Sequence, residues 1–160
     1  MTTTQQTGVS ANSTPRFSVL RIASIVLVLG ALGISAYLSY VKVFNAPMAC
    51  VASPAFDCGT VAASKYSMFL GIPIAVWGLG VNLGLLGILL LEDRIALLQE
   101  YGLMLLFGIL LFGTLYSIWL IVVQAAILGA FCPWCLAHEV IVFALFGIAI
   151  VRLSRDMQPA

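Results

Sequence analysis

The sequence predicts an all-α integral membrane protein: a four-transmembrane-helix bundle with a cysteine-bearing outer loop between helices 1 and 2. Two observations predict this fold. Of the 160 residues, 62% are hydrophobic and only 8% are charged, whereas a soluble domain carries roughly 25% charged residues. Lipid must therefore be the solvent for most of the surface. The apolar residues also fall into four long stretches separated by short polar segments.

We expect the four spans at residues 17–40, 68–91, 103–128 and 132–153. Each is close to the ~20 residues that a tilted helix needs to cross the hydrocarbon core. Residues 1–15 are polar and lack a hydrophobic period, which predicts a disordered cytoplasmic tail. The membrane domain then covers residues 16–154, and residues 155–160 form a second short tail. The first span is too long for a signal peptide and should remain as an anchor.

Basic residues indicate how the chain crosses the membrane. The side that holds both termini and the second-to-third turn has five of them, and the other side has two. The five are Arg16, Arg21, Arg94, Arg152 and Arg155, and the two are Lys42 and Lys65. By the positive-inside rule both termini lie in the cytoplasm of a multi-pass cell-membrane protein. The cysteines then share the outer, oxidising face, periplasmic or extracellular. The sequence contains no run of basic residues, so it does not indicate a nucleic-acid partner.

The sharpest local signal is Cys132-Pro133-Trp134-Cys135, at the start of the fourth span. Two thiols at this spacing can close a disulfide across a first helical turn. Pro133 suits the first helical position, where an N–H would have no partner. Cys132 would then lie near free N–H groups and the positive end of the helix dipole, which stabilise a thiolate. The spacing also fits half of a zinc site, but no second CxxC is present, and we expect no metal.

A second cysteine pair, Cys50 and Cys58, flanks seven residues that include Pro54. A loop of this size closes at little entropic cost. Taken alone, the pair could equally be a structural bridge that fastens the loop. Two pairs on one face of the membrane, one in a loop and one at a helix tip, favour a relay between them.

The combination of these motifs resembles the vitamin K epoxide reductase family. The motifs are Cys50-x7-Cys58, Ser64-Lys65-Tyr66-Ser67, Gly71-Ile72-Pro73 at the opening of the second helix, and Cys132-x2-Cys135 at the opening of the fourth. The resemblance runs from about residue 17 to residue 153. It implies a four-helix bundle around a quinone pocket, capped by the loop that carries the first cysteine pair.

The resemblance implies a quinone-dependent thiol–disulfide oxidoreductase that supports disulfide bond formation. Cys132 and Cys135 are the implied active-site pair, with Cys135 facing a quinone of the ubiquinone, menaquinone or vitamin K type. Cys50 and Cys58 are the implied shuttle pair, which passes electrons inward from a thioredoxin-fold protein acting in trans. Ser64 matches a loop serine that helps organise the site.

Three further positions are candidate quinone contacts. Many family members carry Asn directly after the Gly-Ile-Pro stretch, where it can hydrogen-bond a quinone carbonyl, but this chain has Ile74 there. Trp77 and Trp134 could line a flat pocket for the quinone ring, although packing or interface anchoring also explains each of them.

Three polar residues lie within the expected spans. His138 and Glu139 follow Cys135 on neighbouring faces of the same helix. They could relay protons, since quinone reduction consumes two, but the simpler interpretation is interfacial side chains that meet water. Asn82 lies inside the second span, where a polar group usually pairs across helices.

Two alternatives remain open. A non-enzymatic membrane bundle or assembly factor with structural disulfides would predict intramembrane charges or a helix broken at mid-membrane, and we find no acid or base deep in any expected span. The unrelated four-helix quinone-dependent oxidase of bacterial disulfide formation carries its CxxC-type pair in the first outer loop. Here the CxxC opens the last helix, which favours the vitamin K epoxide reductase type.

Overall fold

The structure is a computed structural model that describes residues 15–50, 53 and 56–156. The predicted N-terminal tail lies outside the described residues except for Pro15, which begins the first helix. Of the predicted C-terminal tail, residues 155 and 156 belong to the last helix, and the rest lies outside the described residues.

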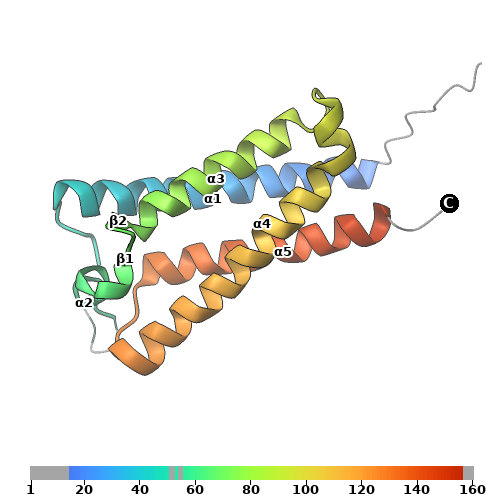
Figure 1. The fold of residues 1–160 in the computed structure, drawn as a ribbon. Helices are drawn as coiled ribbons and strands as arrows, with labels where there is room; N and C mark the ends of the chain where they lie inside the picture. The colour runs from blue at the N-terminus through green and yellow to red at the C-terminus, as the bar shows by residue number, and fades with distance from the viewer. Residues whose placement is uncertain (1–14, 51–52, 54–55, 157–160) are drawn as a thin grey trace, which may run out of the picture.

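Long helices dominate the described chain (Figure 1). They are α1 (Pro15–Phe44), α3 (Ile74–Leu91), α4 (Ala96–Val122) and α5 (Pro133–Asp156). Since α4 continues directly into a π-helical segment, η2 (Val123–Leu128), four helical segments are long and apolar enough to cross a membrane. The predicted four-helix class is therefore confirmed. Shorter elements connect α1 to α3: α2 (Cys58–Ala63), the 3-10 turn η1 (Lys65–Ser67), β1 (Met68–Phe69) and β2 (Ile72–Pro73).

The second helix begins later than predicted. Residues 68–73, expected as its first turns, form a hairpin in which β1 pairs antiparallel with β2. Leu70 and Gly71 at the tip have φ of 52° and 79°, the pair of positive values that a two-residue type I′ turn needs. Pro73 then precedes the helix in extended conformation, with ψ of 135°. The hairpin therefore delays the helix start to Ile74. The prediction began the helix at residue 68 because residues 68–73 are as apolar as a span, although their turn residues favour a hairpin.

The third helix begins earlier than predicted, at Ala96 rather than near residue 103. Its first turns include the polar residues Gln99 and Glu100, which lowered the apolar signal. The Gln99 side chain donates to the Asp93 carbonyl at 2.9 Å and thereby fastens the turn that precedes the helix.

The helices are held closely at one end of the bundle and diverge at the other. α1 packs against α3 and α5, and α4 packs mainly against α5. The start of α1 and the end of α5 lie beside the α3–α4 turn, and the α1–α3 connection with its cysteines lies at the opposite end (Figure 1). α3 and α4 separate towards that cysteine end. The buried core comprises Val28, Leu85, Leu89, Leu106, Leu110, Leu145 and Ala149.

Large apolar side chains cover the outside of the helices. Val19, Phe112, Leu115 and Val140 are each more than half exposed. Such a surface is unfavourable in water and favourable against lipid tails. Because lipid is as apolar as the core, van der Waals packing and polar contacts must hold the helices together.

An ion-pair cluster joins the helix ends away from the cysteines. Glu92 pairs with Arg152 and with Arg21, each at 3.0 Å. Arg21 also pairs with Asp93 and donates to the Leu89 carbonyl at 2.8 Å. That carbonyl is among the last of α3 and lacks a partner within the helix. The cluster therefore ties α1 and α5 to the end of α3.

Removing the charge of Glu92 should destabilise the bundle. The Arg152 side chain is largely buried, and Glu92→Gln would leave it without a counter-charge, at a cost of about 3 kcal/mol. Unfolding in detergent should detect this loss. Asp93→Asn is the matched control: the Asp93 side chain is 67% exposed, so its loss should cost under ~1 kcal/mol. Equal effects of the two changes would contradict the assigned role of Glu92.

Candidate active site

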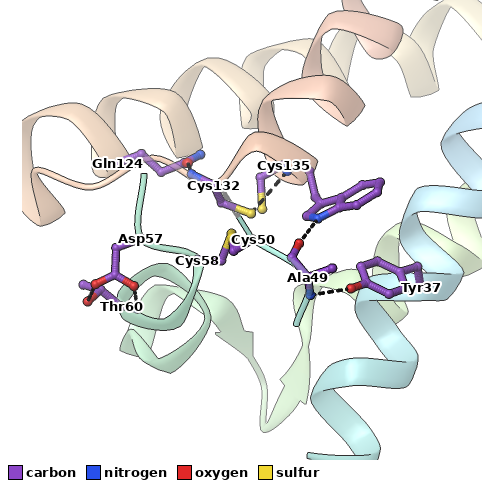
Figure 2. Close-up of a disulfide and its surroundings, with 10 residues drawn as sticks. Tyr37, Ala49, Cys50, Asp57, Cys58, Thr60, Gln124, Cys132 and Cys135 are labelled. Atoms are coloured by element: carbon purple, nitrogen blue, oxygen red, sulfur yellow. Dashed lines mark hydrogen bonds between the residues drawn. A yellow bond between two sulfur atoms is a disulfide. The ribbon is translucent and has the colours of Figure 1, made fainter. Parts of the chain in front are cut away.

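The structure brings the two cysteine pairs together at one end of the bundle (Figure 2). Cys50 and Cys58 form a disulfide with their Cα atoms 6.3 Å apart, and Cys132 and Cys135 are free thiols. Cys58 and Cys132 are almost fully buried, at 1% and 2% exposure. The four predicted catalytic cysteines therefore form one group, although they come from segments far apart in the sequence.

The start of α5 places the inner pair. The helix begins at Pro133, as its position in the motif predicts. The Leu136 amide donates to the Cys132 carbonyl at 3.0 Å, the first hydrogen bond of the helix. The Cys135 amide donates to the Cys132 sulfur at 3.4 Å. Cys132 thus directs its sulfur at the free N–H groups of the first turn.

This position makes Cys132 an unusually acidic thiol. Cys132 lies in the connecting turn, outside the membrane-spanning segments. A hydrogen bond from the Cys135 side chain, assisted by the amides of Cys135 and Trp134, lowers the pKa of Cys132 to about 7, against the opposing effect of burial. A substantial fraction is therefore thiolate at neutral pH, the form that attacks and leaves disulfides.

Gln124, which was not among the predicted site residues, also positions Cys132. The Cys132 amide donates to the Gln124 side-chain oxygen at 2.9 Å, and Gln124 is buried. Gln124 belongs to η2, and π-helical turns commonly reorient side chains at functional sites. Gly129, with φ of 60°, then ends this segment in the left-handed region. The sequence signal that could have identified Gln124 is that it is a single amide side chain within a long apolar run.

Trp134 fastens the segment that carries Cys50. Its indole N–H donates to the Ala49 carbonyl at 2.8 Å, and the Ala49 amide donates to the Tyr37 hydroxyl at 2.9 Å. The rings of Trp134 and Tyr37 pack against each other with their centroids 5.0 Å apart. Trp134, predicted as a quinone contact, is not among the residues that line the cavity described below. The structure places it between α1 and the cysteine loop.

Asp57 fastens the other end of the loop. Its amide donates to the Phe131 carbonyl at 3.2 Å, next to Cys132. Its carboxylate accepts hydrogen bonds from the hydroxyl and the amide of Thr60, at 2.5 and 3.1 Å, and so caps α2. These bonds, the hydroxyl first, lower the pKa of Asp57. Cys58 therefore enters the site as the first residue of a capped helix.

Ser64 lies where α2 ends. Its hydroxyl donates to the Val61 carbonyl at 2.8 Å. The neighbouring Ala62 carbonyl accepts from the Ser67 hydroxyl at 2.7 Å and from the Lys42 ammonium group. The Ser64 hydroxyl bond is therefore local to the end of α2, whereas the Lys42 contact joins α2 to α1. Ser64 also borders the cavity.

A cavity of about 950 Å³ lies beneath this loop. Residues of all four long helices line it. Among the predicted site residues, the cavity is lined by Cys132, Cys135, Ser64, Ile74 and Trp77. Neither Cys50 nor Cys58 is among the lining residues. The inner thiols therefore lie between the loop disulfide and the cavity.

Polar side chains also reach the cavity wall. The Asn82 amide donates to the Ser35 hydroxyl at 3.2 Å and contacts the His138 Nε2 at 3.1 Å, which confirms the predicted pairing across helices. Glu139 is 3% exposed and lines the cavity. The interpretation of Glu139 as an interfacial residue that meets water is therefore wrong. Because Glu139 lies in the first two turns of α5, its burial does not contradict the expectation that no acid or base lies deep in a span. Ala137 and Val140, which lie on either side of Glu139 in the sequence, are exposed. The hydropathy pattern therefore did not indicate that this single acid is buried.

Removing the Cys135 thiol should raise the pKa of Cys132. In protein whose loop cysteines are both Ala, thiolate absorbance should titrate with a midpoint near pH 7 for Cys132. Cys135→Ala removes the side-chain donor that contributes most and should move the midpoint to higher pH. Cys135→Ser keeps a donor and should move it less. An unchanged midpoint in Cys135→Ala would show that the helix start alone sets this acidity.

Comparison with known protein families identifies the family of the chain. The model of the vitamin K epoxide reductase family matches residues 22–150, which is most of the chain. The matched region includes both cysteine pairs and the whole cavity wall. The chain belongs to the vitamin K epoxide reductase family, and this membership supports a membrane thiol–disulfide oxidoreductase activity.

Proposed function

We propose that the protein passes electrons from a thioredoxin-fold protein through Cys50 and Cys58 to Cys132 and Cys135, and from there to a membrane quinone. The observation that carries this proposal is the position of the inner pair: two free thiols between a loop disulfide and a large cavity. A carrier that oxidises secreted proteins has a potential of roughly −120 mV and needs a stronger oxidant to reset it. A lipid-soluble quinone can meet that need at this site.

The cavity suits a quinone ring. Its volume of about 950 Å³ is within the range of small-molecule sites, which are mostly apolar with a few polar groups. Tyr66, Trp77 and Tyr116 contribute aromatic surface against which a flat ring can pack. Ile74 would add an apolar contact at the position where many family members have Asn. A bound quinone would supply a two-electron acceptor beside Cys135.

Differences in burial suggest the order of the loop cysteines. Cys58 is almost fully buried and Cys50 is partly exposed. Cys50 is therefore the sulfur that a partner thiolate attacks, and the bond to Cys58 breaks. The released Cys58 thiolate then attacks Cys132 of the oxidised inner pair, and the electron pair of the broken bond leaves on Cys135. The second thiolate of the partner then attacks the partner sulfur bonded to Cys50, so the partner leaves oxidised and Cys50 is freed. Attack by Cys50 on Cys58 of the Cys58–Cys132 bond restores the loop disulfide and leaves the inner pair reduced.

Charge supports an orientation with both termini in the cytoplasm. Arg21 and Arg152 lie in the ion-pair cluster beside the α3–α4 turn, which also contains Arg94. Lys42 and Lys65 lie at the cysteine end. The positive-inside rule then puts the cysteines on the outer, oxidising face, where a disulfide relay can operate.

Quinone coupling is tested with purified protein in lipid vesicles. A reduced thioredoxin-fold protein should be oxidised in repeated turnovers only when quinone is present. Cys135→Ala should abolish this turnover, because Cys132 then has no partner with which to return to a disulfide. Full turnover in Cys135→Ala, or turnover of the unaltered protein without quinone, would refute the proposed route.

The relay predicts one trapped intermediate. Cys50→Ala removes the thiol that resolves the Cys58–Cys132 bond while leaving the attacking Cys58. That mixed disulfide should therefore accumulate, and alkylation followed by digestion and mass spectrometry should detect a peptide joining the two cysteines. Cys58→Ala should give no such peptide. If Cys58 stays free in Cys50→Ala under every redox buffer, the two pairs do not exchange and the loop disulfide is structural.

A further inference from the structure

Glu139 is the only carboxylate among the described residues that line the cavity. The side chain is 3% exposed, and neither carboxylate oxygen has a hydrogen-bond partner in the described part of the chain. An ionised carboxylate that is buried without partners is strongly unfavourable. The site must therefore offer Glu139 a proton, or a hydrogen-bond donor from a molecule in the cavity.

The other ionisable groups near Glu139 have partners. His138 contacts Asn82 at 3.1 Å, and the ammonium group of Lys42 donates to a backbone carbonyl. The tyrosines of the wall, Tyr66, Tyr101 and Tyr116, carry phenol groups and not carboxyl groups. Among the described residues of the cavity wall, Glu139 alone combines a carboxyl group with the absence of a hydrogen-bond partner. This combination is unusual for a residue that serves only packing.

Glu139 also lies beside the reacting sulfur. It follows Cys135 by four residues in α5, so the two side chains share a face with their Cβ atoms about 6 Å apart. Both line the cavity. A proton on the Glu139 carboxyl group is therefore close both to the Cys135 thiol and to the cavity that the two side chains line.

We propose that Glu139 is a catalytic acid that moves one proton from the Cys135 sulfur to a quinone oxygen in the cavity, an inference that rests on the proposed function. Glu139 gives its proton to that oxygen and accepts the proton of the Cys135 thiol. The Cys132 thiolate and the Cys135 sulfur form the disulfide bond, and two electrons leave the sulfurs for the quinone. Glu139 ends the step protonated, and water on the cysteine side supplies the second proton that the product needs.

The test compares Glu139→Gln with Glu100→Gln, the same change at an exposed position outside the cavity wall. Quinone reduction by protein with a reduced inner pair should fall about 100-fold in Glu139→Gln, the usual effect of losing a general acid, and stay unchanged in Glu100→Gln. Transfer of electrons from the loop pair to the inner pair, measured without quinone, should be unaffected in both. This second reaction also shows that Glu139→Gln folds. An unchanged quinone reaction, or equal losses in both reactions, would overturn the proposal.

Infrared difference spectroscopy gives a readout that needs no quinone. Reducing the inner disulfide of quinone-free protein should perturb a carboxylic-acid carbonyl band in the unaltered chain and in Glu100→Gln, but not in Glu139→Gln. Absence of the band in the unaltered chain would overturn the proposal for Glu139. If the band is present but no quinone is ever reduced, the proposed function fails while Glu139 remains a proton carrier for Cys135. Glu139→Asp, which keeps the acid, should retain the band and most of the quinone rate, and loss of both would indicate a packing role instead.

Discussion

The site depends on hydrogen bonds that dock the α1–α3 connection onto the turn before α5. The Asp57 amide reaches the Phe131 carbonyl, and the Trp134 indole reaches the Ala49 carbonyl. These two contacts lie next to Cys58 and Cys50, so they hold both loop cysteines against the inner pair. Irregular backbone is tolerated in a membrane protein only where its polar groups are satisfied or lie outside the hydrocarbon. The hydrogen bonds at Asp57 and Trp134 satisfy polar groups of the connection. The same bonds place the loop cysteines next to the inner pair.

The parts that the sequence predicted well are those that depend on local properties. Long apolar runs identified the four spans because each helix must satisfy its own backbone in lipid. Pro133 marked the helix start beside Cys132, since its missing N–H is harmless only there. The pairing of Asn82 across helices followed from the cost of an unpartnered amide in an apolar surrounding. The charge distribution predicted that all four cysteines share one face, and the family motifs added their roles as a shuttle pair and an active-site pair.

The parts that the sequence missed depend on contacts between distant segments. Gln124 approaches Cys132 only because a π-helical segment and Gly129 turn the chain back on itself. Trp134 belongs to the active-site motif, yet its partner is Ala49, 85 residues earlier in the chain. The hairpin at 68–73 has the hydropathy of a span, and only its turn residues distinguish it. Glu139 was interpreted as an interfacial residue because it lies near a helix end. It instead lines the cavity, which lies where α3 and α4 diverge.

The residues that hold the bundle together and the residues of the candidate active site lie towards opposite ends of the bundle. Near the α3–α4 turn, the leucine-rich core and the cluster around Glu92 hold the helices at close range. Towards the cysteines α3 and α4 diverge, and the space between the helices becomes a cavity. A buried acid without a partner, such as Glu139, destabilises any helix bundle that contains it. The packed end can offset this destabilisation, because contacts there do not change when the thiols react. The acid can therefore stay beside Cys135 in the cavity wall.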